Sequence, residues 1–193
     1  LISVLWANSE TGNIYPIEEI GRIARKHKVR FHTDAVQAIG KVPVDVQQAN
    51  VDLLVLSGHK IGAPKGVGAI YVRRGTRMTP LLHGGHQERN RRAGTHNVAG
   101  IIGLGRACEM AGEEQPAYYR RVRALRDKLE GGLFKAVDDV KLNGTPDRDL
   151  RLPNTLNISF AYIEGESLLL NLDMFGIAAS FGSACTSGAL EPS

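Results

Sequence analysis

The sequence predicts an α/β fold in which a mainly parallel sheet is flanked by helices. Apolar runs of strand length alternate with segments of helical periodicity through the first hundred residues, and this alternation is typical of βαβ units. The apolar runs are nearly continuous in Val, Leu and Ile, as expected for strands that are buried on both faces. Polar clusters follow three of these runs, at the place where an open parallel sheet binds its ligands.

Four strands and one helix are expected in the first part of the chain. The helix covers residues 17–27, because Ile17, Ile20 and Ala24 recur at helical spacing. The strands, in chain order, cover residues 1–6, 29–32, 51–56 and 67–72. The polar clusters that follow the first three strands are residues 8–12, 34–37 and 57–60.

The alternation of strand-like and helical segments ends near Gly100. An apolar helix is expected next, with Cys108 as a core residue, and a charged helix follows it. The elements of this part, in chain order, are helices at 101–111 and 118–136, strands at 140–142 and 156–160, and a helix at 167–175.

A domain boundary is expected between the two helices, near Glu113 to Pro116, which gives domains 1–113 and 114–193. The chain opens on Leu1 within an expected strand and stops at Ser193 without a helix end. We therefore expect both ends to be cut.

Composition and charge narrow the class of protein. With 42% hydrophobic and 23% charged residues, the 193-residue chain is expected to be ordered and globular. The net charge of +4 is small, and no aromatic residues interleave the arginines of residues 89–92, so nucleic-acid binding is not expected. No apolar run is long enough to span a bilayer and no secretory signal is visible, which favours the cytoplasm and no membrane partner.

Lys60 and Asp34 are the first candidates for chemistry. Lys60 stands where a buried strand ends, and burial would lower its pKa so that the amine can form a Schiff base with an aldehyde cofactor. Asp34 follows the neighbouring strand, where its carboxylate could pair with a protonated pyridine nitrogen. Alone, Lys60 is more often a surface charge and Asp34 a helix N-cap, so the pairing of the two positions carries the prediction.

Cys185 is the candidate nucleophile. A free cysteine is more often a small buried hydrophobe. The neighbours of Cys185, residues 182–188, are small and polar, which indicates an exposed loop where a thiolate can react. Cys108 and Cys185 lie far apart without a CxxC pattern, so neither a disulfide scaffold nor a zinc ribbon is indicated.

A metal site in residues 83–97 is the alternative considered for that segment, since His83, His86, Glu88 and His96 are possible ligands. Two adjacent glycines break any helix that would place two histidines on one face. We therefore expect no resident metal.

Four motifs in order resemble the NifS/IscS-type cysteine desulfurases. They are His32-Thr33-Asp34-Ala35-Val36-Gln37, Ser57-Gly58-His59-Lys60, the stretch from His83 to Asn97, and Gly182-Ser183-Ala184-Cys185-Thr186-Ser187. Residues 6–12 and 152–154 fit the same pattern, so the resemblance covers essentially the whole chain. Motifs in a fixed order are much more specific than one short pattern.

The resemblance implies the fold type I architecture of the pyridoxal-phosphate-dependent transferases, which is that of aspartate aminotransferase. Residues 1–113 would form the rear part of the large cofactor-binding domain. Residues 114–193 would begin the small α+β domain that carries the cysteine loop.

The resemblance also implies roles for residues near the cofactor. Lys60 would bind pyridoxal phosphate as a Schiff base and move the α-proton of the substrate, and Asp34 would hold the pyridinium. Gln37 would hydrogen-bond the phenolic oxygen of the cofactor, while Ser57 and His59 would bind its phosphate. His59 is counted with Lys60 among the catalytic residues.

Further implied roles concern the second subunit and the sulfur. Thr95 would reach the phosphate of the opposite subunit, which makes the active unit a homodimer. Asn8 and Ser9 would lie near the ring, with Ser9 standing where relatives usually have a second Asn. Cys185 would take sulfur from L-cysteine as a persulfide, release alanine, and pass the sulfur to an iron-sulfur scaffold or another acceptor protein. Cys185 could also ligate a transient iron-sulfur cluster.

Two other classes of function stay open at this point. Another fold type I enzyme, such as an aminotransferase or a selenocysteine lyase, would also use Lys60 and Asp34. A binding fragment without activity is the second alternative. By resemblance, an early phosphate-binding segment with a ring-stacking histidine and a late substrate-binding arginine are missing, so the chain alone is expected to be inactive, with unpaired strand edges and exposed apolar faces.

Overall fold

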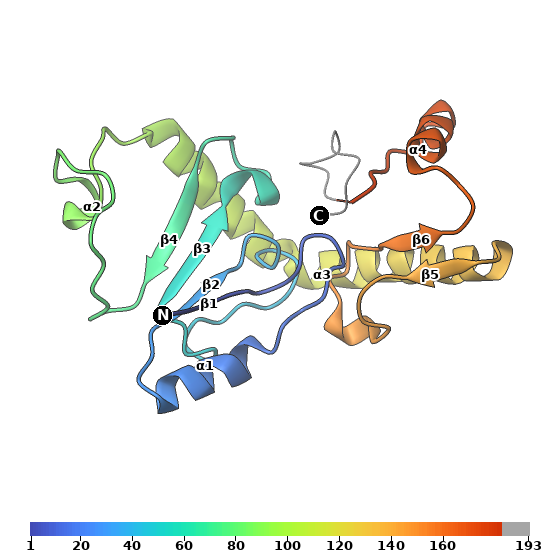
Figure 1. Cartoon of the computed structure of the whole chain (residues 1–193). Helices are drawn as coiled ribbons and strands as arrows, with labels where there is room; N and C mark the ends of the chain where they lie inside the picture. Colours follow the sequence, from blue (N-terminus) through green and yellow to red (C-terminus); the bar gives the residue numbers. More distant parts are fainter. Residues whose placement is uncertain (183–193) are drawn as a thin grey trace. The chain divides into compact units, whose positions relative to one another are not determined.

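The computed structural model describes residues 1–182 of the chain (Figure 1). Its residues form two compact units. Unit 1 consists of residues 1–7 and 15–120, and unit 2 consists of residues 8–14 together with residues from 121 onward. The expected boundary near Glu113 to Pro116 is not a break in the chain, because both residues lie inside one helix.

Unit 1 is built on a sheet with the strand order β1-β2-β3-β4. The strands are β1 (Ile2–Leu5), β2 (Phe31–Asp34), β3 (Leu53–Ser57) and β4 (Gly68–Val72). The first three strands run parallel, with Leu5 opposite Asp34 and Asp34 opposite Val55. The expected parallel-rich α/β fold is thus confirmed, and the carboxyl ends of β1, β2 and β3 share one edge.

The last strand, β4, runs antiparallel to β3, with Ser57 opposite Gly68 (Figure 1). A parallel connection requires a crossover of a dozen or more residues, usually through a helix. The link between β3 and β4 contains only η1 (Gly58–Ile61), a single 3-10 turn, and a short loop. The return direction of β4 therefore follows from the length of this link.

The helix α1 (Ile17–Lys26) agrees with the expected helix at 17–27. Glu18 and Glu19 lie in its first turn and Arg25 and Lys26 in its last turn, where each charge complements the helix dipole. Its buried residues are Ile17, Gly21 and Ala24.

A single helix, α3 (Val98–Ala136), replaces the two helices expected at 101–111 and 118–136. Pro116 lies inside it and removes one hydrogen bond of the helix. Strong helix formers precede Pro116, namely Glu113, Glu114 and Gln115, which accounts for the continuity of the helix.

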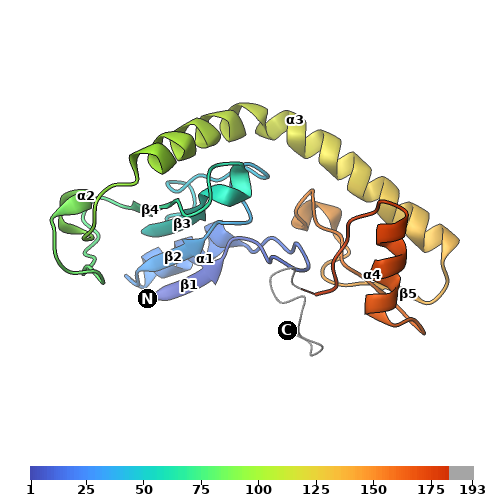
Figure 2. The same ribbon diagram turned by 90° about the horizontal axis from the view of Figure 1, so that it is seen from above.

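The first part of α3 runs along one side of the sheet of unit 1 (Figure 2). It buries Leu104 and Ala107 against Ala63, with Leu56 and two neighbouring apolar residues packed around them. Cys108 follows Ala107 on the helix and is exposed, so the expectation that it is a core residue is wrong. The buried stripe of α3 is narrow, and Cys108 lies outside it.

Unit 2 contains a small antiparallel sheet of β5 (Val140–Leu142) and β6 (Ile158–Phe160). Between these strands lies the 3-10 turn η2 (Arg148–Leu150), and α4 (Gly165–Met174) follows them. These elements agree with the expected strands and helix to within two residues.

The centre of unit 2 is a network of charged side chains, of which Arg126, Glu130 and Arg151 are buried and Arg148 is exposed. Arg151 is fully buried, and its Nη2 donates to Glu130 Oε2 from the second part of α3. Arg148 donates to Glu130 Oε1 at 2.9 Å, and Arg126 Nη1 donates to the carbonyl oxygen of Leu152 at 2.7 Å. The network thus joins α3, η2 and the segment after η2.

Among the described residues, no helix combines the length and the apolar character that are needed to cross a lipid bilayer.

Candidate active site

The carboxyl edge of the sheet in unit 1 brings Asp34 and Ser57 to neighbouring strand ends. Asp34 ends β2 opposite Val55, and Ser57 ends β3 two residues beyond Val55. This placement agrees with the prediction that the polar clusters after β2 and β3 belong to one edge. Ligands of open α/β sheets bind at such an edge.

One oxygen of the Asp34 carboxylate forms a hydrogen bond within the fold, and the other can bind a ligand. Its Oδ1 accepts a hydrogen bond of 2.9 Å from the backbone N–H of Val36 and so holds the turn after β2. Among residues 1–182, the Asp34 carboxylate has no second hydrogen bond, which leaves Oδ2 available to a positively charged donor. Asp34 stabilises a turn here, whereas a helix N-cap was the alternative expected from sequence.

The turn η1 presents His59 and Lys60 on its outer side. Gly58 is buried at its start, where an added Cβ would lie 2.9 Å from the carbonyl oxygen of Val67. Its backbone N–H also donates to that same carbonyl at 2.9 Å. Only glycine fits this position without a shift of backbone atoms, so the close approach of β3 and residue 67 fixes where η1 begins.

Ser57 and His59 form a polar pair beside Lys60. Ser57 Oγ and His59 Nδ1 are 2.8 Å apart, so one of the two groups donates to the other. His59 is exposed and Ser57 half-buried. When the imidazole is neutral, one of these two groups keeps a free donor for an anion, and both can donate when the imidazole is protonated.

Lys60 is exposed, so the burial expected from the sequence is not provided by the described residues. The reason is local, because η1 projects beyond the sheet and an added Cβ at Gly62 or Gly66 would meet nothing within 4 Å. Within residues 1–182, the Lys60 ammonium has no ion pair or hydrogen bond, so it is accessible to a ligand.

Lys41 is a residue of this edge that the sequence reasoning missed. Only 9% of it is exposed, and its Nζ donates to Gln37 Oε1 at 2.9 Å. Burial, and then repulsion from Lys60, lower the pKa of Lys41 to about 8. The spacing of Gln37 and Lys41, four residues apart, is the signal in the sequence that could have found the pair.

Asn8 and Ser9 belong to unit 2. The side-chain oxygen of Asn8 accepts hydrogen bonds from the backbone N–H groups of Glu10 and Thr11, at 2.9 and 2.8 Å, and from the Thr11 hydroxyl. Ser9 is exposed. The oxygen of Asn8 therefore holds the turn of residues 8–12, and only the amide NH2 of Asn8 is suited to reach a ligand.

Thr95 is exposed in the segment between α2 (Gln87–Asn90) and α3. Nearby, His96 Nε2 lies 3.2 Å from Glu88 Oε1. Across the part of the chain that the structure describes, no group of three or more His, Cys, Asp or Glu is placed to hold a metal ion. The pair of Glu88 and His96 is thus a surface contact.

The family model for aminotransferase class-V matches residues 1–192 of the chain. The chain belongs to the aminotransferase class-V family. Over all 193 residues, the chain is 58% identical to the cysteine desulfurase NifS of Azotobacter vinelandii, and it covers 48% of that protein. It is 57% identical over its whole length to the cysteine desulfurase IscS of Methanosarcina thermophila, of which it covers 47%.

A solved NifS-like protein has the same fold as the class-V chain, with a TM-score of 0.85 and 42% sequence identity. That match covers 92% of this chain and 48% of the solved one. The resemblance to NifS/IscS-type proteins and the fold type I architecture are therefore confirmed. The class-V chain spans about half the length of the curated relatives it matches.

The predicted nucleophile of the class-V chain, Cys185, lies outside the described residues. Its role therefore stays a prediction from sequence.

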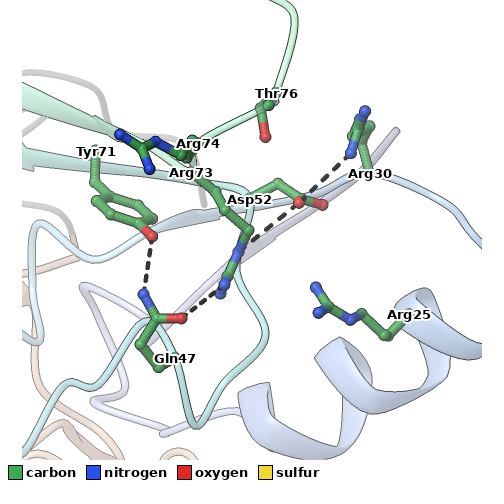
Figure 3. Close-up of a pocket in the computed structure, with 9 residues that line it drawn as sticks. Arg25, Arg30, Gln47, Asp52, Tyr71, Arg73, Arg74 and Thr76 are labelled. Carbon is green, nitrogen blue, oxygen red and sulfur yellow. Dashed lines mark hydrogen bonds and ion pairs between the residues drawn. The ribbon is translucent and has the colours of Figure 1, made fainter.

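The opposite edge of the sheet in the class-V chain holds a polar cavity of about 650 Å³ (Figure 3). Asp52, at the start of β3, accepts from the backbone N–H of Phe31 at 3.0 Å and lies 3.7 Å from Arg30 Nη1. Arg73 donates to Gln47 Oε1 and to the carbonyl oxygens of Val46 and Val51, at 2.7 to 2.9 Å. These contacts tie the loop before β3 to the strands, so we assign this cavity a structural role, separate from the candidate site.

Proposed function

We propose that the chain forms the central part of a pyridoxal-phosphate-dependent cysteine desulfurase, which removes sulfur from L-cysteine and leaves L-alanine and a persulfide on Cys185. The observation that carries this proposal is the convergence of Asp34 and the Ser57-to-Lys60 turn at one parallel sheet edge. The 58% identity with a NifS desulfurase over the entire chain also supports the proposal.

The residues at the edge fit pyridoxal phosphate chemically. Asp34 keeps one carboxylate oxygen for a pyridinium N–H, and the accessible Lys60 amine can bond to the aldehyde carbon. Ser57 and His59 can donate to a phosphate, and Gln37 can donate to the phenolic oxygen. When bound, the cofactor would supply an electron-withdrawing ring that stabilises negative charge at the α-carbon of the substrate.

The chain's own groups would then carry the proton and the sulfur. Lys60 would take the α-proton of cysteine, and His59 would assist the transfer of protons at the edge. The thiolate of Cys185 would attack the substrate sulfur, so that a sulfur–sulfur bond forms while the bond between Cβ and sulfur breaks. Protonation of the carbon skeleton then gives alanine.

The remaining parts of the proposal concern organisation. Residues 1–113 would belong to the large cofactor-binding domain and residues 114–193 to the small domain with the cysteine loop. Thr95 would contact the cofactor phosphate of a second copy, which makes the active unit a homodimer. An iron-sulfur scaffold or another acceptor protein would receive the sulfur in the cytoplasm.

The test uses the natural protein, including whatever residues flank this chain. Cys185→Ser is expected to keep the visible absorbance of bound pyridoxal phosphate and to lose the formation of alanine and persulfide from cysteine. Cys108→Ser is the matched control and should retain both properties. Alanine formation by Cys185→Ser with selenocysteine but not cysteine would favour a selenocysteine lyase, and failure to bind the cofactor would favour a binding fragment.

A further inference from the structure

The end of β2 and the segment after it form a compact turn that carries Asp34, Gln37 and Lys41. Asp34 Oδ1 holds the N–H of Val36 at the start of the turn. The backbone N–H of Lys41 donates to the carbonyl of Ala38 at 3.0 Å and closes its end. The position of Lys41 relative to Gln37 is therefore set by backbone hydrogen bonds.

Two other elements of unit 1 hold this turn from outside. Gln115 Nε2, on α3, donates to the carbonyl oxygen of Lys41 at 3.3 Å. Gly40 has a φ of +74°, and a Cβ there would lie 3.1 Å from Ala111 Cβ on α3 and 3.4 Å from Ile61 Cγ2 on η1. The end of the turn is thus held against α3 at Gly40 and Lys41 and against η1 at Gly40, and Lys41 itself is 9% exposed.

The contact between Lys41 and Gln37 determines the orientation of the glutamine amide. A lysine ammonium has three donors and no acceptor, so the Gln37 atom at 2.9 Å from Nζ must be the oxygen. The NH2 group of Gln37 then points away from Lys41. A glutamine without such a partner can present either its oxygen or its nitrogen to a ligand.

The ammonium form of Lys41 is the major one at neutral pH, because its pKa is lowered by burial and by Lys60 only to about 8. The donor that fixes Gln37 is thus charged at neutral pH.

We propose that Lys41 is a positioning residue, which holds the Gln37 amide so that its NH2 group faces the ligand side as an obligatory hydrogen-bond donor. This inference rests on the proposed function, in which Gln37 meets the phenolic oxygen of pyridoxal phosphate. An ionised phenolic oxygen accepts hydrogen bonds, so a fixed donor stabilises it, whereas a flipped amide would present a second oxygen to it.

The test compares cofactor binding and the visible absorbance of the bound cofactor in the natural protein and in Lys41→Met. The substitution replaces a buried ammonium by an apolar group of similar length, so the fold should be retained. We expect the dissociation constant of pyridoxal phosphate to rise about fivefold, the value of one modest hydrogen bond. The pH at which the visible band changes should also move upward, because the ionised phenolic oxygen loses its donor.

Three further variants separate positioning from general effects. Lys41→Arg keeps a donor without an acceptor and should restore much of the spectrum. In a Gln37→Leu background, Lys41→Met should cause no additional change. Lys65→Met removes an exposed lysine from the link between η1 and β4 and should leave binding and the band unchanged.

The outcomes also distinguish this inference from the proposed function. If the unaltered natural protein does not bind pyridoxal phosphate, the proposed function fails. If it binds the cofactor and Lys41→Met has the same dissociation constant and the same band, the positioning role of Lys41 is wrong. An equal effect of Lys41→Met with and without Gln37 would also overturn it.

Discussion

At the scale of single residues, polar side chains of both units serve the fold and keep groups that a ligand could use. Asp34 uses one oxygen for the turn and keeps the other, and Asn8 uses its oxygen for a turn and keeps its NH2 group. Because a fixed side chain loses less conformational freedom when a ligand binds, such double use prepares a site in advance.

A pH-dependent stability is expected from Lys41. Its pKa is about 8 in the folded protein, against 10.5 for an unperturbed lysine, so the unfolded state binds more protons between these values. Stability should therefore rise with pH in this window, by at most about 3 kcal/mol. Below pH 8 both states are protonated and the contribution is flat.

The measurement is urea unfolding of the natural protein and Lys41→Met at several pH values from 7 to 10. The difference in unfolding free energy should shift in favour of the natural protein as pH increases. A difference that is constant across this range, as expected for the exposed control Lys65→Met, would contradict the burial of an ionisable group at position 41.

Sequence reasoning placed Asp34 and Ser57 correctly because strand ends are marked by a change from apolar to polar residues. It did not find Lys41, whose burial arises from α3 and Gln115, more than seventy positions away. It was wrong on the exposure of Lys60 and Cys108. Exposure depends on which face of a turn or helix meets the rest of the molecule, and a local pattern does not determine that.

At the scale of elements, the packing of α1 depends on Gly21. A Cβ at this position would overlap the carbonyl oxygen of Ala49, and it would lie 3.3 Å from the ring of Phe31. Gly21→Ala is expected to lower the free energy of unfolding by about 2 kcal/mol or more, because backbone atoms must shift.

Gly105→Ala in α3 is the matched control, since a Cβ there would meet nothing within 4 Å. This substitution should raise stability by up to about 1 kcal/mol through the higher helix propensity of alanine. Thermal unfolding measures both. Equal effects of the two substitutions would show that α1 does not pack on residue 49 as described.

The charged network of unit 2 gives a second prediction for elements. Glu130→Gln would leave the fully buried Arg151 without its carboxylate partner, and two of the Arg151 nitrogens already have no hydrogen bond among the described residues. Removal of one partner of a buried ion pair costs about 3–5 kcal/mol. Denaturant unfolding should show this loss, whereas Glu109→Gln, which breaks the exposed ion pair with Arg106, should change stability by less than about 1 kcal/mol.

The bounds of most elements could be predicted from the sequence because hydrophobic periodicity is a local signal. The direction of β4 and the continuity of α3 could not. The first depends on the length of a connection between two strands, and the second on helix formers that outweigh one proline. Neither feature follows from the periodicity of a single segment, because each depends on how adjacent segments are joined.

At the scale of the whole molecule, many large apolar side chains of the described residues are exposed to solvent. Leu81 is 89% exposed, Ile102 68% and Phe175 81%. The expectation of exposed apolar faces is thus confirmed for the described chain. Exposed apolar surface is typical of regions that other protein segments cover, and the chain spans only about half the length of its curated relatives.

The most direct test of the account is to identify the lysine that bonds to pyridoxal phosphate. The natural protein is loaded with the cofactor, reduced with borohydride, digested and mapped by mass spectrometry. The account predicts a pyridoxyl group on Lys60, with loading weakened by Asp34→Ala. A label on Lys41 or on any other lysine, or loading that is indifferent to Asp34, would contradict a single site formed by the ends of β2 and β3.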